Sequence, residues 1–180
     1  ERRPARTMQL VLEAAFHSDD EEQHNTLQLW GRMRALLASA TALLAHGSPS
    51  VALRRGLSYY HHRVAVDLPL AAEHARAAVQ VAEGLHGAGV AHPAVAASLG
   101  NLGTVLQAMG KLPEALAMQQ RSLAMKEELH GAGVAHPDVA ASLNNVGNVL
   151  KAMGKLPEAL AMQQRCLAML EELHGAGVAH

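Results

Sequence analysis

Hydrophobic residues recur at helical spacing through the second half of the chain. From residue 137 to 153 they lie on one helical face, mostly three or four positions apart, as Val139, Leu143, Val146, Val149, Leu150 and Met153. A second set follows after a short break, at Leu156, Ala159, Leu160, Met162, Leu167, Met169 and Leu173. This spacing is typical of amphipathic helices. It predicts two consecutive helices that each bury one face.

Proline and glycine mark the ends of these helices. Pro137 suits a first helical turn, where its missing N–H has no partner to lose, and Asp138 suits the positive end of the helix dipole. Gly154 can take the left-handed conformation that ends a helix, and Pro157 starts the second one. We therefore expect a helical hairpin with its turn at Gly154–Lys155.

The same pattern returns with a period of 44 residues. Residues 92–135 and 136–179 differ at only seven positions, and 48–91 is a more divergent copy. The segment LHGAGVAHP links successive copies. Periods of roughly 20–50 residues indicate stacked units that cannot bury their apolar faces alone. With no strand signal in the chain, we predict an all-α fold, an α-solenoid of antiparallel helix pairs.

The last two copies resemble the tetratricopeptide repeat. The signature positions are Leu143, Val146, Gly147, Leu150, Gly154, Leu156 and Ala159, with Leu99, Leu102, Gly103, Leu106, Gly110, Leu112 and Ala115 in the preceding copy. The sequence is similar to the longer repeats of the kinesin light chain and nephrocystin-3 type. The resemblance implies a right-handed superhelix in which Gly147 and Ala159 let paired helices approach closely.

The chain also departs from that repeat signature. The position that is usually aromatic is Gln119 in one copy and Gln163 in the next. In the divergent copy Tyr59 replaces the expected glycine and Arg55 replaces a large apolar residue. We therefore expect looser packing, or a slightly altered angle, in that copy.

The expected organisation is three repeats after an N-terminal region. The repeats are 48–91, 92–135 and 136–179, within a segment 48–180 that stops inside a further copy and is interpreted as C-terminally truncated. Residues 1–47 are interpreted as a degenerate repeat or a capping helical hairpin. Its helices are expected within 5–16 and 26–47, with Asn25 or Thr26 as a cap.

Candidate binding residues lie on the first helix of each repeat, which lines the inner surface of such arrays. Asparagine carries a donor and an acceptor and can therefore pair with the backbone of an extended peptide, while lysine and arginine suit a carboxylate. Three of the seven differences between the near-identical copies fall on this face, although exposed polar residues also occur without a partner. The predicted peptide-binding set is Tyr60, Arg63, Asn101, Thr104, Gln107, Asn144, Asn145, Asn148 and Lys151.

Composition and motifs argue against other functions. A net charge of −1 and 2% aromatic residues give no surface for nucleic acid or anionic membranes. Cys166 is the only cysteine, so no intramolecular disulfide forms, which fits a cytoplasmic location. No catalytic or nucleotide-binding motif is present, so the chain is predicted not to be an enzyme and to need no cofactor.

Histidines form H-x5-H pairs in the repeated loops, at His86/His92, His130/His136 and His174/His180. Such pairs bind zinc or nickel in some proteins. No carboxylate or thiol recurs with them at ligand spacing, and histidines beside a helix start also bond to free helix ends. The sequence therefore predicts structural histidines and no metal site.

These observations favour a non-catalytic scaffold that binds an extended segment of a protein partner in the groove of the solenoid. An alternative is the C-terminal sensor or autoinhibitory arm of a larger signal-transduction NTPase, which repeats of this type also resemble. A third interpretation is self-association through the last helix, which lacks a polar terminal cap.

Overall fold

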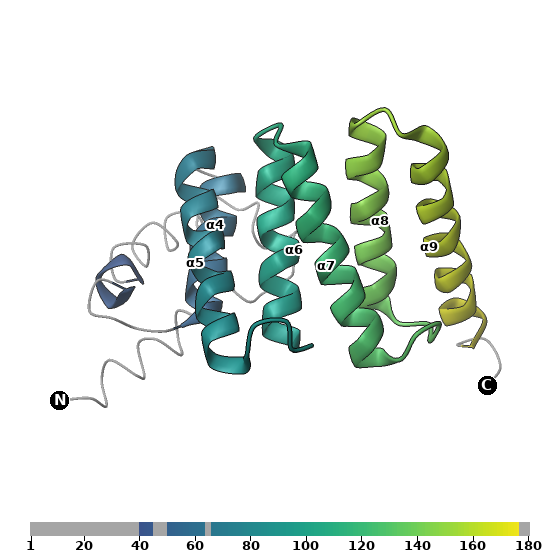
Figure 1. Cartoon of the computed structure of the whole chain (residues 1–180), viewed down its shortest axis with the longest axis horizontal. Coiled ribbons are helices and arrows are strands. Elements are labelled where there is room, and N and C mark those ends of the chain that lie inside the picture. The colour runs from purple at the N-terminus through teal and green to yellow at the C-terminus, as the bar shows by residue number, and fades with distance from the viewer. Residues whose placement is uncertain (1–39, 45–49, 64–65, 177–180) are drawn as a thin grey trace. The chain divides into compact units, whose positions relative to one another are not determined.

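The computed structural model describes residues 40–44, 50–63 and 66–176, and these residues form helices joined by short turns (Figure 1). The helices are α4 (Val51–Arg63), α5 (Leu68–His86), α6 (Pro93–Ala108), α7 (Leu112–His130), α8 (Pro137–Ala152) and α9 (Leu156–Ala176). The described part of the chain contains no strand, and its helices follow one another as antiparallel pairs. The predicted all-α fold of helix pairs is therefore confirmed.

The chain divides into two compact units, residues 1–81 and 82–180, with the boundary inside α5. In the second unit α6 packs on α7 and α8 packs on α9, while α7 also packs on α8 and joins the two pairs. The first helices, α6 and α8, contact each other as well. Figure 1 shows α6 to α9 as a row in which each helix runs antiparallel to the one before it.

The turn signals of the sequence act as predicted. His92 and His136 have extended backbones, and the Nδ1 atom of each accepts a hydrogen bond from the N–H two residues later, at 3.2 Å. The pairs of helices turn at Gly110 (φ 73°) and Gly154 (φ 77°), in the left-handed region that glycine tolerates best. The expected role of these histidines as partners of free helix ends is confirmed.

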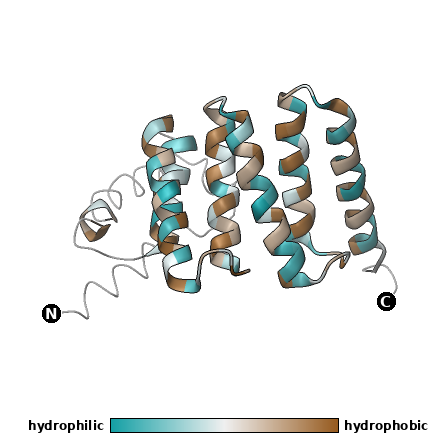
Figure 2. Ribbon diagram, viewed as in Figure 1, coloured by the Kyte–Doolittle hydropathy of each residue, from teal (hydrophilic) through white to brown (hydrophobic). Residues whose placement is uncertain are grey.

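The core of the second unit lies between its helices. Val139, Leu143, Val146 and Leu150 of α8 form a buried cluster with Leu123 of α7 and Ala159 of α9. Figure 2 shows hydrophobic and hydrophilic positions alternating around each helix, as expected for helices that bury one face. The cluster therefore spans two helix pairs and couples them.

Glycine allows the two helices of each pair to approach. A Cβ atom on Gly103 would lie 2.8 Å from Cγ and Cδ of Gln119, and one on Gly147 would lie 3.2 Å from Cγ of Gln163. Both distances are shorter than ordinary van der Waals contact. The close approach expected from Gly147 is confirmed, and Gly103 has the same role in the preceding repeat.

The first unit has its own small core. Residues 40–44 are helical, and Ala40 is buried with Leu53 and Leu57 of α4. The Oγ atom of Ser50 accepts a hydrogen bond from the N–H of Leu53 at 3.1 Å, which caps the start of α4. The helix predicted over 5–16 and most of that over 26–47, with Asn25 and Thr26, lie outside the described residues.

Among the described residues, no helix combines the length and the apolar character needed to cross a bilayer.

Candidate partner-binding surface

One face of α8 exposes a line of polar side chains. Asn144, Asn148 and Lys151 are exposed, and their spacing of four and three residues places them on the same side of the helix. Asn145 beside them is half-buried. This line, Asn144–Asn148–Lys151, is called the α8 stripe below. It offers amide donors and acceptors and one positive charge to solvent.

The matching positions of α6 are less accessible. Thr104 and Gln107 are half-buried, and Gly100 has no side chain. The Thr104 hydroxyl donates to the Gly100 carbonyl at 3.1 Å and accepts a hydrogen bond from Nε2 of Gln119 at 3.3 Å. Thr104 thus serves the packing of its own repeat.

Gln119 of α7 makes contacts that the sequence did not predict. It is only 1% exposed, lies over Gly103, and donates from Nε2 to the Gly100 carbonyl at 3.1 Å. A neighbouring hydroxyl, Ser122 Oγ, donates to the Ala96 carbonyl at 2.7 Å. The glutamine at a position that is usually aromatic was visible in the sequence, but its hydrogen bonds to α6 were not predicted.

These contacts change how the differences between the two repeats are interpreted. A Cβ atom at Gly100 would lie 3.3 Å from Ser122 Oγ, whereas the later repeat has Asn144 and Cys166 at the corresponding positions. Two of the three differences on the inner face, Gly100/Asn144 and Thr104/Asn148, therefore occur where the α6 residue serves an internal contact. For the third difference, Gln107/Lys151, no internal contact of the described residues explains the change.

The repeated asparagines, Asn101 and Asn145, are half-buried on neighbouring first helices. The Nδ2 atom of Asn101 is buried and has no hydrogen-bond partner among the described residues. Because this nitrogen is buried, Asn101 can contact a peptide only through its remaining exposed atoms. The exposed part of the predicted set in the second unit is therefore the α8 stripe.

Tyr60 and Arg63 belong to α4 in the first unit. Arg63 is exposed, but Tyr60 is only 6% exposed and its ring meets that of His61 edge-on. A side chain packed inside its own unit offers little surface to a partner. We therefore leave Tyr60 out of the proposed surface, and the roles predicted for both residues stay predictions.

Polar contacts join successive repeats along the second helices. Arg121 of α7 pairs with Glu83 of α5 at 2.7 Å, and Arg165 of α9 pairs with Glu127 of α7 at 2.9 Å. In each case the arginine lies 38 residues after the glutamate. Lys126 of α7 also donates to Ser142 Oγ of α8 at 2.8 Å. The last two of these bonds connect the α6–α7 pair to the α8–α9 pair.

A repeated stack of antiparallel helix pairs with inter-pair contacts defines a helical repeat protein. A family model for the tetratricopeptide repeat matches residues 95–138 and 139–180. These residues therefore belong to the tetratricopeptide repeat family, as the resemblance of the sequence implied. Such repeats generally mediate protein–protein interaction and are typically non-catalytic.

Solved structures show the same fold. BtubC (BKLC) from P. vanneervenii has a TM-score of 0.71 at 22% identity, with 82% of this chain and 60% of that chain covered. The nearly identical TPR-like repeats assigned to a kinesin light chain of Podosopora anserina have a TM-score of 0.50 at 16% identity, covering 96% and 99% of the two chains. A variant of those repeats with a single substitution has a TM-score of 0.51 at 16% identity, with 97% of this chain and 99% of that chain covered. No match was found among curated proteins.

Proposed function

We propose that the chain is a non-catalytic interaction module that binds an extended segment of a partner protein along the first helices α6 and α8. The observation that carries the proposal is the α8 stripe, a line of exposed amides and one cation on a helix whose other faces are buried. Amides recognise backbone donors and acceptors whatever the partner's side chains, and Lys151 suits an acidic side chain or a terminal carboxylate.

The geometry of α6 and α8 supports the same assignment. The two helices are in contact, so a segment that lies along the α8 stripe can also reach α6, where Gln107 is half-buried. The ion pairs between successive repeats lie on the second helices instead. An extended peptide that follows α8 would therefore meet the exposed side chains of the α8 stripe, whereas Thr104 of α6 is bonded within its own repeat.

The test exploits the two near-identical repeats. A peptide library is screened against the chain, and the selected peptide is measured by isothermal titration. The double variant Asn148→Thr/Lys151→Gln gives α8 the residues that α6 has at the same positions. We expect binding to weaken at least about tenfold, a loss typical of residues at the centre of an interface.

A control variant separates this loss from general loss of polar surface. Gln120→Ala/Gln164→Ala removes two exposed amides from the second helices. This variant should bind as the unchanged chain does, and both variants should keep its helical circular dichroism. Equal binding by the α8 variant would refute the proposed site.

A second candidate function, self-association, is favoured by α9. Leu160 and Leu167 of α9 are 55% and 57% exposed, and Leu170 stands where α7 has Lys126. In an antiparallel pair of α9 helices, Leu160 would face the second copy's Leu167. Each copy would then present the same exposed leucines to the other, as a two-fold interface requires.

Analytical ultracentrifugation tests that candidate. The chain should form a dimer at micromolar concentration, and Leu160→Glu/Leu167→Glu should return it to a monomer. Val134→Glu, an exposed apolar position in a loop, serves as the control and should leave the dimer intact. A chain that is monomeric throughout the concentration series excludes the α9 dimer.

A further inference from the structure

The two inter-repeat loops place the same pair of histidines in contact. The imidazole rings of His86 and His92 stack with centroids 3.4 Å apart and planes at 11°, and those of His130 and His136 have the same separation and angle. The loops share the sequence LHGAGVAHP, so identical chemistry gives identical geometry. The first residue that differs after this segment is Ala94 in one repeat and Asp138 in the other.

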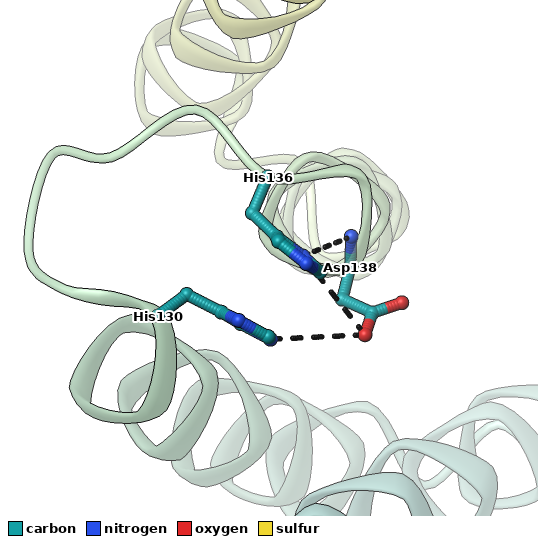
Figure 3. Close-up of side chains that lie close together, drawn as sticks. All are labelled: His130, His136 and Asp138. Carbon is teal, nitrogen blue, oxygen red and sulfur yellow. Dashed lines mark hydrogen bonds and ion pairs between the residues drawn. The ribbon is translucent and has the colours of Figure 1, made fainter.

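Asp138 adds a carboxylate to the second histidine pair. Its Oδ2 atom lies 3.8 Å from Nε2 of His130 and 4.0 Å from Nδ1 of His136, at the edge of the stacked rings (Figure 3). One ligand atom from each residue can be chosen so that all three lie within 4.8 Å of one another. The rings are half-buried and the carboxylate is exposed, so an ion can reach them from solvent.

We propose that His130, His136 and Asp138 bind one divalent transition-metal ion of the zinc class. Two imidazoles and a carboxylate are ligands that Zn²⁺ takes at about 2.0–2.2 Å, with water completing the site. The point equidistant from the three ligand atoms lies slightly farther from each of them than a zinc–ligand bond length. The site closes on the ion when the donors draw together by a few tenths of an ångström.

Two adjustments accompany binding. The stacked rings turn about their Cβ–Cγ bonds, because the lone pairs of parallel rings do not converge on one point. Binding also breaks the hydrogen bond that Nδ1 of His136 accepts from the N–H of Asp138 at 3.2 Å. The carboxylate offsets the unfavourable position of a cation at the start of α8. The ion thus ties the end of α7 to the start of α8 across the turn at Gly131 and Gly133, whose φ angles are 95° and 81°.

The other loop is a matched control inside the same chain. His86 and His92 have the same stacked geometry but are followed by Ala94, so this loop has two imidazoles and no carboxylate at that position. Asp138→Ala makes the second loop match the first, and Ala94→Asp gives the first loop the ligand set of the second. Both residues lie in a first helical turn, where alanine and aspartate already occur in this chain.

Isothermal titration of ZnCl₂ into the untagged chain at neutral pH tests the proposal. We expect one site that Asp138→Ala weakens at least about tenfold, and two such sites in Ala94→Asp. The ring resonances of His130 and His136 should shift together with the first equivalent of zinc. Equal affinity and stoichiometry for the unchanged chain and Asp138→Ala would overturn the proposal and leave the cluster with a capping role only. Circular dichroism of each variant shows that the comparison is made between folded chains.

Discussion

The two repeats of the second unit have nearly the same sequence but different surroundings. Leu123 of α7 is 8% exposed because α8 covers it, whereas its counterpart Leu167 of α9 is 57% exposed. Gln119 is buried and bonded to α6, whereas Gln163 is exposed. Burial in a helical array is therefore decided by the neighbouring pair as much as by the residue itself. The two repeats thus hold the same residue types at matching positions, and these residues differ only in the helices around them.

The leucine pair gives the largest expected difference. Leu123→Ala removes a side chain from the cluster shared by α7 and α8 and should lower the free energy of unfolding by about 2–4 kcal/mol. Leu167→Ala removes the same atoms from an exposed site and should change it by less than about 0.5 kcal/mol. Urea denaturation followed by circular dichroism measures both. Equal losses would mean that α9 is covered as well as α7.

Much of this fold could be predicted from the sequence. The period of 44, the His-Pro starts and the Gly-Lys turns located the helix pairs because these signals are local. The buried face of α8 was predicted by the spacing of its hydrophobic residues. The hydrogen bonds from Gln119 to α6 could not be predicted, because they depend on how closely Gly103 lets α7 approach. Asp138 lies near His130 because of the conformation of the loop between them, and the spacing of the two residues in the sequence does not determine that conformation.

The two interhelix glycines should respond in opposite ways to alanine. In Gly103→Ala the new methyl group meets Gln119, which is buried and bonded, so unfolding free energy should fall by about 1–3 kcal/mol. In Gly147→Ala it meets Gln163, which is exposed and can turn away. Higher helix propensity should then leave stability unchanged or raise it by up to about 1 kcal/mol. Thermal melts of the two variants show whether Gln119 is held as described.

The first unit contains three histidines that are buried or half-buried. His61 and His74 have stacked rings 5.6 Å apart, and burial lowers the pKa of each below its usual value. Around His74, the charges of His61 and Arg54 also lower the pKa, while Glu73 raises it. Burial likewise lowers the pKa of His62. The first unit thus holds these histidines in the neutral form more strongly than an unfolded chain does.

The first unit should therefore lose stability in acid. As the pH falls below about 6.5, the unfolded chain takes up protons before the folded chain does. The stabilisation is complete above that pH and is lost as the pH falls through the lowered pKa values. The only tyrosines, Tyr59 and Tyr60, lie on α4 and report its unfolding by near-ultraviolet circular dichroism. His61→Gln/His74→Gln should flatten this pH dependence, and an unchanged profile would show that the two histidines do not cause it.

The arginine–glutamate pairs should give the smallest effects. Arg121→Ala and Arg165→Ala each remove one partly exposed ion pair between second helices, and each should lower unfolding free energy by at most about 1 kcal/mol. Added salt should reduce both losses because it screens exposed charges. A larger and salt-independent loss at Arg121 alone would indicate a structural role beyond the ion pair.

The most direct test of the proposed interaction surface is a map of backbone amide chemical shifts when the selected peptide binds. We predict that the largest shifts fall on α8 around Asn145, Asn148 and Lys151 and continue onto α6 near Gln107. Shifts confined to α7 and α9, with the first helices unchanged, would contradict the account.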